Sequence, residues 1–331
     1  MSGIKSTALR YAPDLAMIFI IVIWGCHFIV MKSGLSDIPP LTYNALRYAI
    51  AMPFITGMIL YRDRTAIRIS RGDIVQLLVV FTIGSTVYQI FFALALNLTT
   101  STNTALVVAT MPAWTAIISI FAGMVALRRR MLIGVGITLV GVIIVVLGGS
   151  GAHFGLSHND LIGSLLALAG AIVTAWGNIA TKPLVDRLGG IRVSLWSYWI
   201  TTGGLIVIAL PDLIHLSPDR VPPRVWPNIF YSGFLSGILG TLIWNYALKA
   251  LGPTRAVSYQ NFPPIVAAVA GIIFLGDPLT LGLVVGGTLT LAGVVMVRKN
   301  TFLKPARAGQ EWSLMPFRWG RGKTSGRHLP S

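Results

Sequence analysis

Ten long apolar stretches constrain this chain more than any other feature of its sequence. They cover about residues 13–34, 40–60, 74–96, 102–125, 131–148, 160–181, 192–211, 228–250, 255–275 and 281–298. A helix needs about 20 apolar residues to cross a hydrocarbon core ~30 Å thick, because each residue adds about 1.5 Å. Strands of a membrane barrel alternate in hydrophobicity, whereas these runs are continuous. The pattern predicts an all-α polytopic membrane protein with ten transmembrane helices.

Composition excludes several other classes of protein. The chain is 54% hydrophobic and only 11% charged, where soluble domains have about a quarter of their residues charged. Its single cysteine, Cys26, excludes a disulfide framework and a cysteine-based metal site, and we expect no metal and no cofactor. The net charge of +16 suggests a nucleic-acid partner, but the charges sit in small groups between apolar runs. We therefore expect no nucleic-acid binding.

The basic residues predict the orientation. If both termini are cytoplasmic, 22 of the 26 Lys and Arg residues face the cytoplasm, and Lys32, Arg220 and Arg224 lie outside. Arg47 falls within the second span. The first stretch is longer than the apolar region of a signal peptide, so we expect it to be a retained helix.

The two halves of the chain carry matching residues at offsets of 151 to 154. The matches are Trp24-Gly25 with Trp176-Gly177, Phe92-Ala93-Leu94 with Tyr246-Ala247-Leu248, Ala105 to Pro112 with Ala256 to Pro263, and Gly134 with Gly286. Each half has five spans, an odd number, so the second copy is expected upside down in the membrane. Inverted repeats of this kind are typical of transporters, in which two similar halves exchange conformations around one site.

This organisation predicts five segments. They are a cytoplasmic N-terminus at 1–12, a first five-helix repeat at 13–148, an extracytoplasmic connection at 149–159, a second, inverted repeat at 160–298, and a basic, disordered cytoplasmic tail at 299–331.

Trp24-Gly25 followed by Lys32, and then Pro40 and Arg47 in the next span, resembles the drug/metabolite transporter superfamily in its EamA-type branch. The resemblance covers roughly 13–298 and implies a secondary transporter of small molecules. Within the branch the chain is most similar to bacterial exporters of amino acids and related metabolites. This implies a location in the bacterial cytoplasmic (inner) membrane, as a monomer or homodimer. The chain departs from many such proteins in having Arg128-Arg129-Arg130 where they have an acidic residue.

Polar and aromatic side chains within the spans are the candidates for lining a substrate pathway, because polarity facing lipid is costly. The candidates are Trp24, His27, Arg47, Tyr88, Gln89, Thr110, Trp114, Trp176, Asn178, Asn245, Ser258, Tyr259, Gln260 and Asn261. The Trp and His residues among them could equally well be packing residues between helices that contact no substrate. Pro112 and Pro263 occupy matching positions, where we expect local breaks that present backbone groups to substrate.

The ionisable residues leave several mechanisms open. Arg47 is expected either to reach the membrane surface or to bind a carboxylate, and Lys32 to extend to the outer surface. The acidic residues all fall at span ends, in loops or in the tail. Their positions favour facilitated diffusion, exchange, or proton coupling through His27. The sequence has no phosphate-binding Gly-rich loop for ATP.

The leading hypothesis is an exporter of small metabolites that works by alternating access, with amino acids, including aromatic or apolar ones, as substrates. Export of lipophilic drugs or cations is the alternative, although such carriers normally use an intramembrane acid. A membrane-embedded transferase is the hypothesis from another class. Its only candidate site is formed by His153, His158 and Asp160.

Overall fold

The protein is predominantly helical in the part described by its computed structural model, which covers residues 2–148, 157–217, 219, 221–252, 255–256 and 259–301. No β-strand occurs in these residues. The first half contains α1 (Ser2–Leu35), α2 (Pro40–Arg62), η1 (Arg64–Ile67), α3 (Arg71–Phe81), η2 (Thr82–Val87), α4 (Tyr88–Leu98), α5 (Ser101–Val108), α6 (Met111–Phe121) and α7 (Arg129–Leu147). The second half contains α8 (His158–Leu188), α9 (Gly190–Leu213), α10 (Val225–Phe230), η4 (Tyr231–Leu239), α11 (Gly240–Leu251), α13 (Pro263–Ala270), η5 (Gly271–Leu275) and α14 (Leu281–Thr301).

Eight helical stretches among the described residues are long and apolar enough to cross a bilayer. They are Ala12–Leu35, Arg71–Leu98, Ser101–Phe121, Arg129–Leu147, His158–Leu188, Gly190–Leu213, Val225–Leu251 and Leu281–Arg298. Helices also form where the sequence predicts the second and ninth spans. Of these, α2 is less apolar because its first half carries Asn44 and Arg47, and Pro263–Leu275 is shorter. Ten complete spans therefore stay a prediction.

Helix breaks occur immediately before the two matched prolines, as the sequence predicts. Helix α5 ends at Val108 and α6 begins at Met111, and α13 begins at Pro263 after a turn. Proline suits the first turn of a helix, where its missing N–H would have no helical partner. At the first break, Thr110 Oγ1 donates to the carbonyl of Val107 at 2.7 Å and stabilises the turn.

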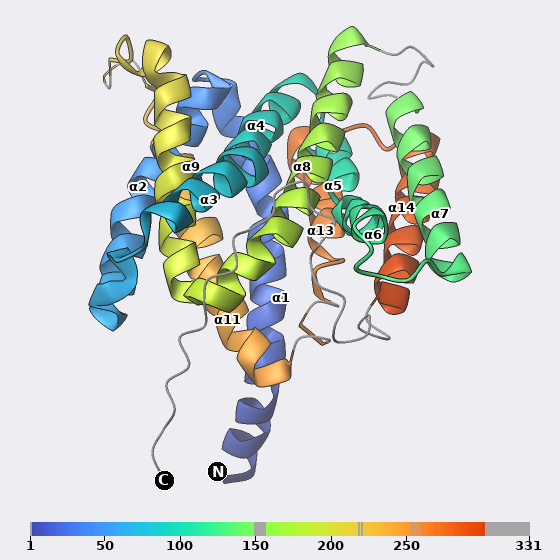
Figure 1. Ribbon diagram of the computed structural model, residues 1–331. Coiled ribbons are helices and arrows are strands. Elements are labelled where there is room, and N and C mark those ends of the chain that lie inside the picture. The colour runs from blue at the N-terminus through green and yellow to red at the C-terminus, as the bar shows by residue number, and fades with distance from the viewer. Residues whose placement is uncertain are drawn as a thin grey trace, which may run out of the picture.

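Glycines set the closest approach between helices. A Cβ at Gly141 of α7 would lie 2.4 Å from the backbone nitrogen of Thr290 in α14, and one at Gly84 of η2 would lie 2.6 Å from Cα of Gly177 in α8. Small residues allow this contact between backbones, which gives membrane helices packing energy that lipid cannot supply. Helices α7 and α14 pack together at one edge of the molecule, α2 and α9 at the other, with α1 between them (Figure 1).

Substitution at the α7–α14 contact is expected to destabilise the protein. Gly141→Ala places a methyl group against backbone that cannot move aside, at a cost of about 1–3 kcal/mol. Gly136→Ala, in the same helix, is the control, because a Cβ there meets nothing within 4 Å. We expect a lower melting temperature in detergent for Gly141→Ala and an unchanged or slightly higher one for Gly136→Ala. Equal melting temperatures for the two variants would contradict the close contact.

Candidate substrate pathway

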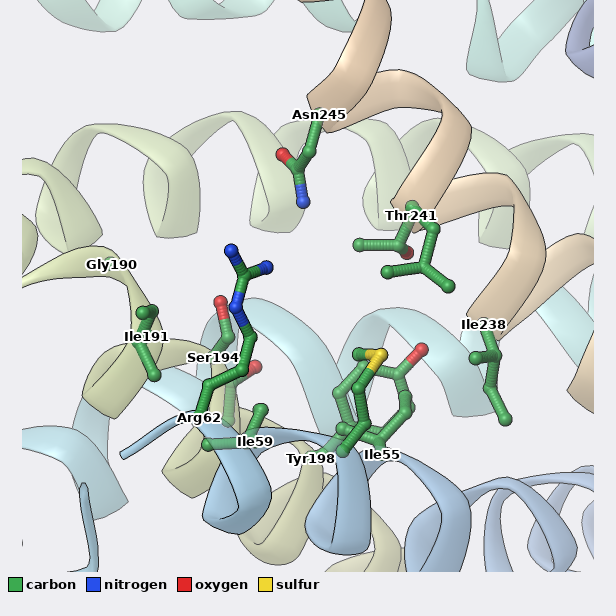
Figure 2. A pocket seen from close by; sticks show the side chains of 13 residues that line it. Ile55, Ile59, Arg62, Gly190, Ile191, Ser194, Tyr198, Ile238, Thr241 and Asn245 are labelled. Carbon is green, nitrogen blue, oxygen red and sulfur yellow. The ribbon is translucent and has the colours of Figure 1, made fainter. Parts of the chain in front are cut away.

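Three adjoining cavities lie between the helices. The central cavity, about 230 Å³, is lined by Trp24, His27, Phe28, Arg47, Tyr48, Tyr88, Gln89, Phe92, Ser236 and Gly237. The α2–α9 cavity, about 460 Å³, is lined by Ile55, Met58, Ile59, Arg62, Gly190, Ile191, Ser194, Ser197, Tyr198, Ile238, Thr241, Leu242 and Asn245 (Figure 2). The proline cavity, about 260 Å³, is lined by Trp24, Phe28, Ala105, Val108, Ala109, Met111, Pro112, Gln260, Asn261, Pro263, Pro264, Leu291, Val294 and Arg298.

Helical spacing brings the residues of the central cavity together. Trp24, His27 and Phe28 lie three and four residues apart on α1, and therefore share one face of that helix. Tyr88 and Phe92 have the same spacing on α4. The segment η4 closes the cavity, and Trp24 Nε1 donates to its Ser236 carbonyl at 3.1 Å.

Close packing by glycine fixes η4 against the helix that carries Arg47. A Cβ at Gly233 would lie 2.5 Å from the Arg47 carbonyl oxygen, and one at Gly240 would lie 2.7 Å from Trp24 Nε1. Both glycines lie in the stretch formed by η4 and α11, and η4 is π-helical, a conformation often found at functional sites. The sequence therefore lets the second half of the chain approach α1 and α2 directly at the cavity.

Arg47 is held in the cavity by neutral groups. Its side chain is buried, with Nε donating to Asn44 Oδ1 at 2.6 Å and Nη2 donating to Gln89 Oε1 at 2.7 Å. Its guanidinium also lies 4.8 Å from the Tyr48 ring centroid, and Gln89 Nε2 donates to the Tyr48 hydroxyl at 2.6 Å. Arg47 does not reach the surface, which is one of the two outcomes expected from the sequence. Its partners in the protein are amide oxygens, and it makes no ion pair with any described carboxylate, so its binding of a carboxylate stays a prediction that concerns a ligand.

His27 is the second polar group of interest in the central cavity. It is 8% exposed, and its ring stacks at 6.1 Å on Phe92. Within the described part of the chain, Nδ1 of His27 has no hydrogen-bond partner. A buried polar atom without a partner is uncommon in native structures, because leaving water costs free energy that no bond returns.

The central cavity adjoins each of the other two. Trp24 and Phe28 line both the central and the proline cavities. The rings of Tyr48, in the central cavity, and Tyr198, in the α2–α9 cavity, lie 5.7 Å apart. In Figure 2 the Arg62 side chain extends into the α2–α9 cavity toward Asn245. The two tyrosine rings therefore lie between the α2–α9 cavity and the central cavity.

The end of the bundle at which α1 ends and α2 begins, called here the Asp37 end, is closed. A buried apolar cluster fills it, made of Met31, Leu35, Ile38, Tyr43, Phe92, Ala93, Leu96, Val221, Val225 and Ile229. The Tyr43 hydroxyl, at the centre of this packing, donates to the Asn228 carbonyl at 2.9 Å and shares a hydrogen bond of 2.8 Å with Ser232 Oγ.

A salt bridge lies over the apolar cluster. Arg224 donates to both carboxylate oxygens of Asp37, at 2.6 and 3.0 Å. These hydrogen bonds lower the pKa of the Asp37 carboxyl below its usual value, which keeps the pair charged. Nearby, the half-buried Lys32 donates to the carbonyls of Leu96 and Thr99 at 2.5 and 2.8 Å, where α4 ends. Its extension to the outer surface of the membrane stays a prediction.

The structure brings together five of the predicted pathway residues in the central cavity: Trp24, His27, Arg47, Tyr88 and Gln89. Asn245 lines the α2–α9 cavity, and Gln260 and Asn261 line the proline cavity. Ser258 lies outside the described residues.

The other candidates do not line the three cavities. Trp176 packs in an apolar cluster with Leu77 and Phe81. Thr110 bonds within the first helix break, and Trp114 is a half-buried residue of α6. Two more make separate contacts: Asn178 donates to Met111 Sδ at 3.6 Å, and Tyr259 donates to Asp14 at 2.6 Å.

Sequence reasoning missed several lining residues. Phe28, Tyr48, Phe92, Ser236 and Gly237 complete the central cavity. Helical spacing was a usable signal for two of them, because Phe92 follows Tyr88 by one turn and Phe28 follows Trp24 by one turn. The same rule would have identified Asn44, three residues before Arg47, as a partner of the guanidinium. No comparable signal marks Ser236 and Gly237, which reach the cavity through long-range packing.

The described part of the chain was expected to lack metal-ligating clusters and a transferase site. Among these residues no three His, Cys, Asp or Glu side chains lie together so as to hold a metal ion. Of the candidate transferase site, Asp160 accepts a hydrogen bond from Thr99 Oγ1 at 2.9 Å, and His153 lies outside the described residues.

Loss of the Tyr43 hydroxyl is expected to weaken the closed end. Tyr43→Phe leaves a buried carbonyl and the Ser232 hydroxyl short of a partner, which costs about 1–2 kcal/mol. Tyr61→Phe is the control, because Tyr61 is 91% exposed. We expect a lower melting temperature in detergent for Tyr43→Phe alone. A melting temperature equal to that of Tyr61→Phe would show that the hydrogen bonds do not stabilise this end.

Comparison with known proteins agrees with this architecture. The model of the EamA-like transporter family matches residues 12–147 and 161–299. A "Probable terminal-alkyne amino-acid exporter" of Streptantibioticus cattleyicolor is 25% identical over 86% of this chain and 93% of its own. A "Probable amino-acid metabolite efflux pump" of Salmonella typhimurium is 24% identical, with 84% and 91% covered.

One solved crystal structure shares the fold. Its TM-score is 0.59 at 20% sequence identity, and the match covers 88% of this chain and 98% of that one. The family match extends over both halves of the chain and agrees with the apolar helices, and the predicted resemblance to EamA-type proteins is confirmed. The chain is a multi-pass membrane transporter that belongs to the EamA-like transporter family of the drug/metabolite transporter superfamily.

Proposed function

We propose that this protein exports small metabolites, with amino acids that have apolar or aromatic side chains as its first substrates, from the bacterial cytoplasm by alternating access. The observation that carries the proposal is the central cavity. It combines aromatic walls with Arg47, Gln89 and His27 inside a membrane bundle. Ionisable side chains within a membrane are costly to bury and for that reason usually mark a functional site. The names of two relatives, an amino-acid exporter and an amino-acid metabolite efflux pump, support this substrate class.

Helix packing supports two repeats of five helices. When each helix of the first half is matched with the corresponding helix of the second half, α1 corresponds to α8, α2 to α9 and α4 to α11. The packing of α1 on α11 then corresponds to that of α8 on α4, and the packing of α2 on η4 corresponds to that of α9 on η2. The π-helical segments η2 and η4 also begin 149 residues apart, at Thr82 and Tyr231. We infer ten spans in two inverted repeats, since five spans per repeat reverse the second copy.

The distribution of cavities supports alternating access. Apolar packing and the Asp37–Arg224 salt bridge close the Asp37 end, whereas the α2–α9 cavity lies where α2 ends and α9 begins. The distribution of basic residues supports an orientation with the first end outside and the second in the cytoplasm. In this assignment the conformation is inward-facing, and export requires the Asp37 end to open while the α2–α9 cavity closes.

Transport can be tested by counterflow. Proteoliposomes loaded with unlabelled phenylalanine are expected to accumulate labelled phenylalanine transiently, because a carrier exchanges substrate across the membrane faster than it dissipates the gradient. Vesicles that contain no protein serve as the control for passive entry of phenylalanine. Failure of exchange across a wide amino-acid panel would exclude this substrate class.

Orientation can be tested with cysteines in a Cys26→Ser background. Ser36 and Ser194 are both exposed, beside Asp37 and in the α2–α9 cavity respectively. We expect a membrane-impermeant thiol reagent to label the Ser36→Cys variant in intact cells and the Ser194→Cys variant only after permeabilisation. The reverse pattern would invert the proposed topology.

A further inference from the structure

We propose that Arg47 is the carboxylate-binding group of the central cavity, so that the site selects small carboxylate anions and does not require the ammonium group of an amino acid. The inference rests on the proposed function and names the chemistry that its substrates must share. Neutral amides and cationic amines of the same shape are expected to be rejected.

The first argument is the uncompensated charge of Arg47. A guanidinium does not lose its proton in a protein, and a buried charge is normally paired with an opposite one. The partners of Arg47 are the amide oxygens of Asn44 and Gln89, and it makes no salt bridge to any carboxylate of the described residues. The cavity beside it therefore holds a positive charge that an anionic ligand would neutralise.

The second argument is the donor geometry. Asn44 and Gln89 take one N–H each from Nε and Nη2, and Nη1 makes no hydrogen bond within the described part of the chain. A guanidinium has five N–H donors in a planar fork that fits a carboxylate in two parallel bonds. The two amides therefore orient the group while leaving N–H donors on Nη1 and Nη2 for a ligand.

The third argument is the charge of the neighbouring cavities. Each of the three is lined by one arginine: Arg47 in the central cavity, Arg62 in the α2–α9 cavity and Arg298 in the proline cavity. None of the three has an aspartate or glutamate among its lining residues. A cleft lined by one sign of charge concentrates ligands of the opposite sign, which disfavours cations along this route.

The rest of the cavity determines which carboxylates fit. Tyr48, Tyr88 and Phe92 offer aromatic surface for an apolar substituent, and the buried His27 Nδ1 offers a polar contact. With no acidic lining residue, an ammonium group has no ionic partner there. A volume of about 230 Å³ is below the range of roughly 300–1,000 Å³ that is usual for drug-sized ligands. A 2-oxo acid with an aromatic side chain combines the favoured features.

A charge series tests the selectivity by direct binding to the purified protein in detergent. The probes are phenylpyruvate, an anion, phenylalanine, a zwitterion, and phenylalaninamide, which has the shape of phenylalanine but no carboxylate. We expect the two carboxylates to bind and to raise the melting temperature, and the amide to bind at least ~10-fold more weakly. Equal binding of phenylalaninamide and phenylpyruvate would overturn the inference.

Variants of Arg47 test the residue itself. Arg47→Gln is expected to weaken phenylpyruvate binding about 10- to 100-fold, the usual effect of losing a charge-assisted hydrogen-bonded pair, and Arg47→Lys to restore part of it. Arg68→Gln removes the same charge from an exposed position outside the three cavities and serves as control. Unchanged phenylpyruvate affinity in Arg47→Gln would overturn the inference.

Gln89→Glu remains informative if Arg47→Gln does not fold. It puts a carboxylate where Gln89 Oε1 already accepts from Arg47. We expect a higher melting temperature together with loss of phenylpyruvate binding, because the protein then supplies the anion itself. Retention of normal binding by a folded Gln89→Glu protein would overturn the inference.

The binding assay separates this inference from the proposed function. Binding of carboxylates that depends on Arg47, without exchange across vesicles, supports the site and contradicts the exporter. Exchange of phenylalanine that phenylalaninamide inhibits equally well, and that persists in Arg47→Gln, supports the exporter and contradicts the site.

Discussion

Hydrocarbon offers no hydrogen bonds, and this constraint governs the structure from its backbone to its central cavity. A polar group within the membrane is costly unless protein satisfies it, and the described spans are accordingly helices, whose backbone groups bond to one another. The same constraint brings Asn44 and Gln89 to Arg47. Glycine contacts then make the packing close enough to keep such groups away from lipid.

The two ends of the bundle differ in how the helices meet. At the Asp37 end, apolar side chains from α1, α2, α4 and α10 pack around the buried Tyr43 ring. At the end where α2 finishes, the side chains of Arg62, Ser194 and Asn245 surround a cavity instead of filling it (Figure 2). Helix α2 and the continuous stretch Val225–Leu251 contribute to both ends, so tilting of one half against the other would exchange packing at one end for a cavity at the other.

Much of this architecture could be predicted from the sequence because hydropathy and helical spacing are local properties. The apolar stretches located the helices, and polar residues within them located Trp24, His27, Arg47, Tyr88 and Gln89. The direction in which a helix faces depends on its neighbours, and for that reason Trp176 was selected although it packs against Leu77. The neutral partners of Arg47 were missed because charge pairing was assumed, whereas packing supplied two amides.

The solitary charge of Arg47 also has an electrical consequence. With the proposed anion bound, the site is neutral when it faces outward; after release it returns with one positive charge. Each cycle then moves one negative charge out of the cell. At an inside-negative potential this gains about 2.3 kcal/mol per 100 mV. The membrane voltage would thus drive export without a coupling ion, and the cavity would need no carboxylate to carry protons or sodium.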